Sequence, residues 1–73
     1  MTNKEYIDAQ ISLLDLNKFV IDRQSEAMGD YWVEFKDIND DDTDAMNFAK
    51  LLIDCDVTSI RARKPGVLIV RFF

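Results

Sequence analysis

The chain has 73 residues, a net charge of −5, one cysteine and no histidine. Its length fits one domain, residues 1–73, with a small core. The single cysteine excludes a disulfide within the chain, and the lack of histidine excludes Cys–His zinc sites, His-based catalytic triads and His-based acid–base pairs.

The first expected element is an amphipathic helix near the N-terminus. Residues 2–5, Thr-Asn-Lys-Glu, fit a capping box, in which a hydroxyl and a carboxylate satisfy free backbone amides at a helix start. Ile7, Ile11 and Leu14 follow at helical spacing, so the pattern predicts a helix that ends near Leu16-Asn17.

A β-hairpin is expected next, within residues 18–36, because the hydrophobic spacing changes from helical to alternating. A Gly-Asp pair supplies its turn. Pairing Ile21 with Val33 and Phe19 with Phe35 gives one continuous apolar face. The other face would then carry Val20, Asp22, Trp32, Glu34 and Lys36.

A second helix is predicted after the first hairpin. Ala45, Phe48, Ala49 and Leu52 recur at helical spacing, and this pattern ends near Cys55.

A second hairpin closes the chain, with two β-rich runs around Pro65-Gly66. A two-residue Pro-Gly turn would be type II, whose twist suits hairpins poorly. We therefore expect a five-residue loop, residues 63–67, whose register keeps one face apolar. That register pairs Ala62 with Leu68, Ile60 with Val70 and Thr58 with Phe72.

The predicted fold is α+β in the order α-β-β-α-β-β, with a four-stranded, mainly antiparallel sheet packed against two helices. Its second sheet face would expose an apolar set: Val20, Trp32, Val67, Ile69 and Phe73. A lone domain seldom exposes so much apolar surface, so we expect a helix or a second chain to cover it, the latter as a homodimer. Trp32 is either a partner anchor or covered by the first helix.

The acidic segment of residues 37–44 is the main candidate binding site, with Asp37, Asp40, Asp41, Asp42 and Asp44. A calcium loop starting at Asp37 would have Asp42 in place of Gly at position 6 and Phe48 in place of Glu at position 12. Starting at Asp40, position 12 is Leu51. We therefore expect no dedicated metal or cofactor, although adventitious Mg²⁺ or Ca²⁺ binding stays open. A helix start accounts for one or two aspartates, and the others form a solvated loop or contact a basic partner.

Positive charge is concentrated at the other end of the chain. Positions 1–56 hold all fourteen acidic residues and five basic ones, a net charge of −9, whereas positions 57–73 hold four basic residues and no acid. These four are Arg61, Arg63, Lys64 and Arg71. A basic β-ribbon can bind nucleic acid, but the pI near 4.4 favours the interpretation that these residues answer the acidic segment within the chain or in a second copy.

Catalysis has little support in the sequence. Cys55 lies between Asp54 and Asp56, whose negative charge disfavours a thiolate. With only two glycines, the chain has no Gly-rich phosphate loop. We expect a protein that is not an enzyme.

The N-terminal segment lacks a basic start followed by an apolar run, and no stretch approaches ~18 consecutive apolar residues. We therefore expect neither a signal peptide nor a membrane span, and a cytoplasmic location.

These features favour a small acidic protein-binding module. In size, charge and composition the chain resembles the short acidic proteins of bacteriophages and other mobile elements, including anti-restriction and anti-CRISPR factors. The resemblance implies an inhibitor or decoy, acting in the host-cell cytoplasm, whose aspartates mimic phosphates on a basic, nucleic-acid-binding surface of a target. In this interpretation the partner-binding residues are the five aspartates, Trp32 and Glu34. The alternatives are a dimeric nucleic-acid-binding regulator that uses the basic hairpin, and an antitoxin or assembly adaptor.

Overall fold

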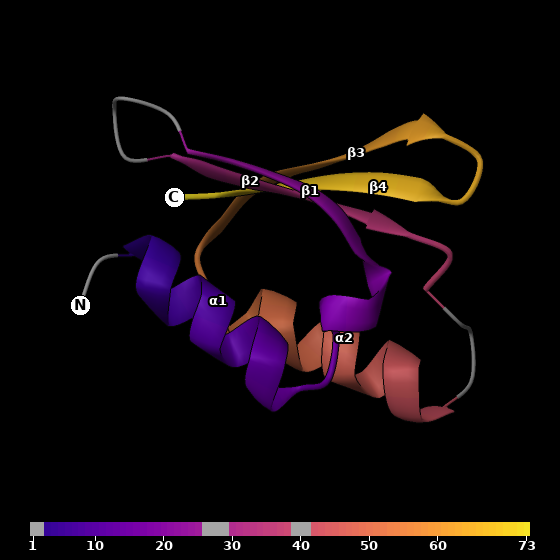
Figure 1. Ribbon diagram of the computed structural model, residues 1–73, viewed down its shortest axis with the longest axis horizontal. Coiled ribbons are helices and arrows are strands. Elements are labelled where there is room, and N and C mark those ends of the chain that lie inside the picture. Colours follow the sequence, from indigo (N-terminus) through magenta and orange to yellow (C-terminus); the bar gives the residue numbers. More distant parts are fainter. Residues whose placement is uncertain (1–2, 26–29, 39–41) are drawn as a thin grey trace.

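The computed structural model describes residues 3–25, 30–38 and 42–73, and the fold has two layers. Figure 1 shows a four-stranded antiparallel sheet with both helices on one of its faces. The elements are α1 (Asn3–Leu13), the short 3₁₀ helix η1 (Asn17–Phe19), β1 (Val20–Ser25), β2 (Tyr31–Lys36), α2 (Asp42–Asp54), β3 (Val57–Lys64) and β4 (Val67–Phe72). The predicted fold class and element order are confirmed.

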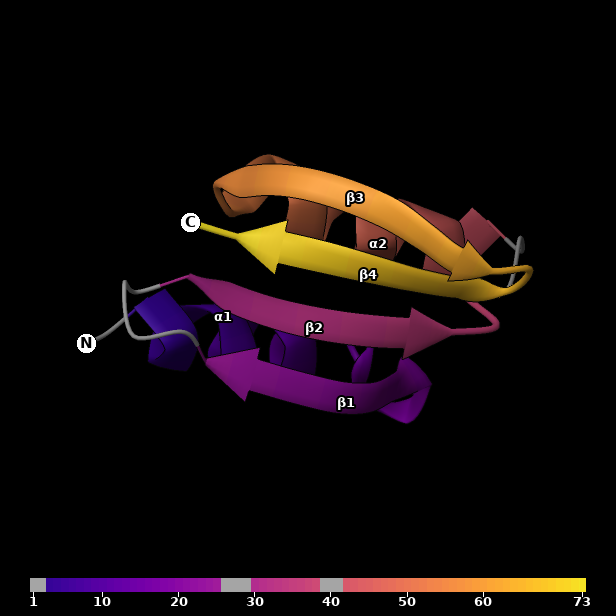
Figure 2. The same ribbon diagram turned by 90° about the horizontal axis from the view of Figure 1, so that it is seen from above.

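The sheet order is β1-β2-β4-β3, so the two hairpins meet along β2 and β4. Seen from above in Figure 2, α1 lies beneath β1 and β2, and α2 lies beneath β4 and β3. The other face of the sheet carries no helix of the described chain (Figures 1 and 2).

Helix α1 ends earlier than predicted, at Leu13. The Leu16 N–H donates to the Ile11 carbonyl at 2.9 Å, and the Asp15 N–H donates to the Ser12 carbonyl at 3.1 Å. Together with φ of 57° at Asp15, these bonds form a Schellman cap, in which a left-handed residue closes the helix. Leu16 and Ile11 are both fully buried and supply the hydrophobic contact that accompanies this cap.

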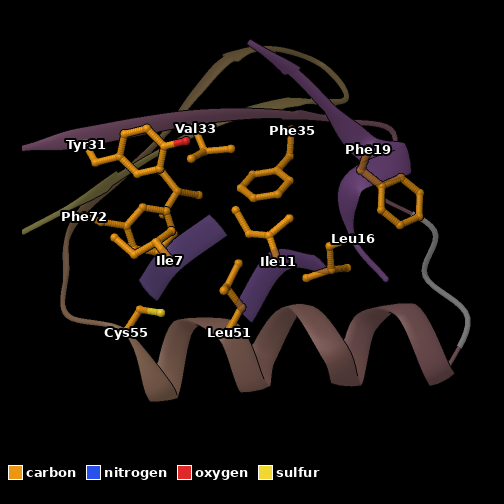
Figure 3. Close-up of a cluster of buried hydrophobic side chains, with 11 residues drawn as sticks. Ile7, Ile11, Leu16, Phe19, Tyr31, Val33, Phe35, Leu51, Cys55 and Phe72 are labelled. Atoms are coloured by element: carbon orange, nitrogen blue, oxygen red, sulfur yellow. The ribbon is translucent and has the colours of Figure 1, made fainter. Parts of the chain in front are cut away.

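The core lies between the sheet and the helices, as Figure 3 shows. Phe35 of this core packs edge to face against the partly buried Phe48, with ring centroids 5.3 Å apart. Burying each large apolar side chain contributes about 1.5–3 kcal/mol, which is how a short chain without disulfides holds together. The buried cluster contains Ile7, Ile11, Leu16, Phe19, Tyr31, Val33, Phe35, Leu51, Cys55, Val70 and Phe72.

The predicted register of the first hairpin is wrong, by two residues at Val33 and by one residue at Phe35. Val33 pairs with Arg23 instead of Ile21, and Ile21 is the extra residue of a bulge and half exposed. Arg23 is stable at this rim position because its guanidinium contacts Asp8, at 3.4 Å, and the side-chain oxygen of Asn17, at 2.7 Å.

Two apolar residues of this segment therefore lie elsewhere than predicted. Phe19 enters the core from η1 and not from a strand. Val20 pairs with Phe35 and packs against the core, so its predicted place on the outer face is wrong. The predicted Gly29-Asp30 turn lies mostly outside the described residues.

The second hairpin keeps two of the predicted residue pairs but has a shorter turn than predicted. The pairs Ala62–Leu68 and Ile60–Val70 are confirmed, yet β3 and β4 are joined by the two-residue Pro65-Gly66 turn, not by a five-residue loop. An irregularity between Ala62 and Lys64 adds one residue to β3 and restores the register. A second one makes Val57, not Thr58, the partner of Phe72.

Candidate interaction surface

The face of the sheet away from the helices is the first candidate surface. Tyr31, Val33 and Phe35 are buried in the core, so the alternation along β2 places Trp32 and Glu34 on the outer face. Helix α1 therefore does not cover Trp32. An open hollow of about 360 Å³ lies here, lined by Asp22, Arg23, Gln24, Trp32, Glu34, Arg63 and Ile69.

Trp32 is half-buried because a guanidinium lies over its ring. The Arg71 guanidinium carbon is 5.1 Å from the ring centroid, within the range of a cation–π contact. Arg71 is held there by Asp30, which accepts from Nε at 2.9 Å and also from the terminal nitrogen. The indole N–H of Trp32 is buried and has no hydrogen-bond partner in the described chain, at a typical cost of about 1–3 kcal/mol.

A second ion pair crosses the same face. The Nη1 atom of Arg63 donates to both carboxylate oxygens of Glu34, at 3.1 and 3.2 Å. The Glu34 side chain is only 13% exposed, so its carboxylate is already satisfied within the chain. Of the predicted partner-binding residues, Glu34 is thus engaged internally.

The outer face is less apolar than the sequence predicts. Val67 is 1% exposed and Ile69 is half-buried, whereas Phe73 is 68% exposed. The side chains of Arg63 and Arg71 lie across this face and cover part of it, as long cationic side chains can do with their aliphatic stems.

The four basic residues of the C-terminal hairpin divide into two pairs. Arg63 forms an ion pair with Glu34, and Arg71 forms one with Asp30. These two arginines thus pair with acids of the same chain, but not with the acidic segment of residues 37–44 that we expected. Arg61 and Lys64 are exposed and make no ion pair within the described residues.

The predicted acidic site separates into parts. Asp44 is 8% exposed and turned inward, with Lys18 Nζ 3.7 Å from its carboxylate. This negative charge is the main cause of a raised Lys18 pKa. Asp40 and Asp41 lie outside the described residues, and Asp42 is the first residue of α2.

Asp37, the residue after β2, lies beside the Pro65-Gly66 turn that joins β3 to β4. Its N–H donates to the Gly66 carbonyl at 2.7 Å, and its φ of 55° turns the chain out of β2. The start of the acidic segment therefore contacts the basic turn of β3 and β4, although the two are far apart in sequence.

Sequence reasoning missed the polar network on the helix side of the sheet. The Tyr31 hydroxyl donates to Asp8 at 2.6 Å, and Arg23 approaches the same carboxylate oxygen at 3.4 Å. Burial is the main cause of a raised Tyr31 pKa, and the hydrogen bond to Asp8 adds to it. The signal that could have predicted this network is the position of Asp8, three residues before the core residue Ile11 and on the same side of α1.

Within the described ranges, no three His, Cys, Asp or Glu side chains are grouped to hold a metal ion. The described helices include none that is long and apolar enough to cross a membrane. Comparisons with protein-family models, with curated proteins and with solved structures found no match, so function is argued from the chain's own residues.

Proposed function

We propose that this chain is a small acidic protein-binding module that acts as an inhibitor or decoy on a basic, nucleic-acid-binding surface of a target protein. The supporting observation is that Arg63 and Arg71, half of the basic charge in the C-terminal hairpin, are engaged in ion pairs within the chain. These two arginines are therefore not available to bind phosphate, and the net charge of −5 favours a basic partner.

Exposed carboxylates without an internal cation carry the proposed contact. Asp22, Asp37, Asp54 and Asp56 are exposed and make no ion pair with a described Lys or Arg. Asp37 directly follows the strand that bears Trp32, so the acidic segment begins where that strand ends. In the proposal Asp40, Asp41 and Asp42 add negative charge to the contact, whereas Asp44 serves the fold and Glu34 orients Arg63.

In this mechanism the carboxylates take the place of backbone phosphates. Long-range attraction accelerates the encounter, and this acceleration falls steeply with ionic strength. Burial of Trp32, together with Ile69 beside it in the hollow, then slows dissociation.

Capture from cell lysate tests the proposal. The native chain is compared with Asp40→Asn/Asp41→Asn and with a control of equal charge outside the proposed contact, Glu5→Gln/Asp15→Asn. The proposal predicts that a basic, nucleic-acid-handling protein, identified by mass spectrometry, is retained by the native chain and the control but is lost from the Asp40/Asp41 variant. Equal capture by all three proteins would contradict it.

The alternative is a nucleic-acid-binding regulator, and one observation favours it: Arg61 and Lys64 are exposed without an ion pair in the described chain. A homodimer through the outer sheet face would double these charges. Titration of a labelled oligonucleotide with the native chain and with Arg61→Gln/Lys64→Gln separates the two functions. Binding that this variant loses would support the regulator, and sedimentation would show whether the binding species is a dimer.

A further inference from the structure

A second hollow, of about 310 Å³, lies at the end of the molecule where the first turn of α1, the end of α2 and the end of β4 come together (left in Figure 1). We call it the terminal notch, and its lining residues are Tyr6, Ile7, Asp54, Cys55, Asp56 and Phe73. We infer that the terminal notch binds the guanidinium group of an arginine side chain presented by a protein partner.

The walls of the notch are aromatic. Tyr6 is 41% exposed and Phe73 is 68% exposed, so both rings offer surface to a ligand. The Phe73 N–H donates to the Asp56 carbonyl at 2.9 Å, which holds the last residue beside the connection from α2 to β3. Ile7 and Cys55 are almost fully buried and form the floor.

Two carboxylates add negative charge to these aromatic walls. Asp54 ends α2 and Asp56 follows Cys55, and both are exposed without an ion pair to a described Lys or Arg. The last turn of α2 contains no basic residue. Both acids therefore lie at the negative end of the helix dipole, where a carboxylate destabilises a helix and a cation stabilises it.

The two carboxylates also act on the thiol of Cys55, which lies between them in the chain. Burial raises the pKa of its thiol, and the charges of Asp54 and Asp56 raise it further. The two carboxylates thus give the notch a negative field, and no ion pair with a described Lys or Arg engages either of them.

Arginine fits this combination better than other ligands. Its planar guanidinium stacks on aromatic faces and donates to carboxylates in the same plane, whereas the lysine ammonium is a compact, strongly hydrated charge. An anion or a phosphate would be repelled. The open shape and the hydrophobic floor suit an aliphatic stem with a cationic end.

This inference names the side chain that a basic partner would present and rests on the proposed function for the existence of that partner. The residues are different from Asp40 and Asp41, so the two ideas can fail separately. Lysate capture tests the function, and a titration with a defined peptide tests the notch alone.

The experiment is a ¹H–¹⁵N NMR titration of the full chain with a short acetylated, amidated peptide that has one central arginine. A matched peptide carries citrulline, which keeps the shape and removes the charge. We expect shifts confined to the notch residues, and binding of the arginine peptide about tenfold tighter than of the citrulline peptide. Equal binding of both peptides, or shifts centred elsewhere, would overturn the inference.

Variants separate the notch from general acidity. Asp54→Asn/Asp56→Asn and, independently, Tyr6→Leu should each weaken the arginine peptide several-fold. The control Asp15→Asn/Asp22→Asn removes the same charge elsewhere and should leave the affinity within twofold. An equal loss in the control would show non-specific attraction and refute the site. Because Asp54, Asp56 and Tyr6 are exposed, the spectra of these variants should keep the native pattern of peaks.

Discussion

Tyr31→Phe tests the polar network that joins α1 to the sheet. The substitution removes one oxygen from a side chain that is 1% exposed and deletes the 2.6 Å hydrogen bond to Asp8. A hydrogen bond to a charged group contributes about 1.5–3 kcal/mol. Because the Asp8 side chain is 35% exposed and keeps Arg23, we take the low end, about 1.5 kcal/mol. For a domain of this size that corresponds to roughly 6–12 °C in Tm.

The assay is urea unfolding followed by the fluorescence of Trp32, the only tryptophan of the chain. We expect a lower midpoint with an unchanged slope, because the surface exposed on unfolding stays the same. Tyr6→Phe is the matched control, since Tyr6 is 41% exposed. Equal losses for the two variants, or no loss for Tyr31→Phe, would refute the role assigned to the hydrogen bond.

The same pair of proteins gives a pH dependence whose sign follows from the raised Tyr31 pKa. Above about pH 10 the unfolded tyrosine releases its proton while the folded one keeps it, so the native chain loses stability as pH rises. This loss is at most about 1.4 kcal/mol per pH unit and is absent in Tyr31→Phe. The stability difference between the two proteins should therefore shrink towards zero near pH 11, and a constant difference would contradict the burial of Tyr31.

Three further substitutions test other parts of the account by urea unfolding. Asp44→Asn should lower the free energy of unfolding by about 1 kcal/mol, because it removes the pair with Lys18 and a charge near the positive end of α2. Asp54→Asn removes a charge at the negative end of α2 and should raise the free energy of unfolding by about 0.3–1 kcal/mol. Changes of the same sign would contradict the dipole argument. Gly66→Ala should cost about 1–2 kcal/mol, because φ is 84° and a Cβ would lie 2.7 Å from Asp37 Oδ1, and an unchanged midpoint would refute this strain. Leu51→Ala should cost about 2–5 kcal/mol as a buried cavity, and a smaller loss would show that the core collapses around it.

The fold could be predicted from the sequence because hydrophobic spacing alone distinguishes its helices from its strands. The details that failed depend on single polar residues. Asp15 takes the left-handed position that usually signals a helix end through glycine, so α1 was predicted too long. Arg23 takes an inward register position because Asp8 and Asn17 satisfy it, and this long-range pairing has no local signal in the sequence.

The candidate site was predicted less well than the fold. The alternation along β2 predicted that Trp32 faces away from the core, but the ion pairs of Arg63 and Arg71 depend on the alignment of strands that are distant in the chain. Asp44 looked like part of an exposed cluster, yet helical geometry turns it towards Lys18. The terminal notch combines residues 6, 54–56 and 73, so no local motif could have revealed it.

The measurement that tests the central claim most directly is displacement of nucleic acid from the target captured by the native chain. A labelled oligonucleotide is bound to that target, and its fluorescence anisotropy is followed as the chain is added. The decoy account predicts that the native chain releases the oligonucleotide and that Asp40→Asn/Asp41→Asn requires a higher concentration to do so. An anisotropy that stays high or rises, because chain, target and oligonucleotide form one complex, would contradict the account.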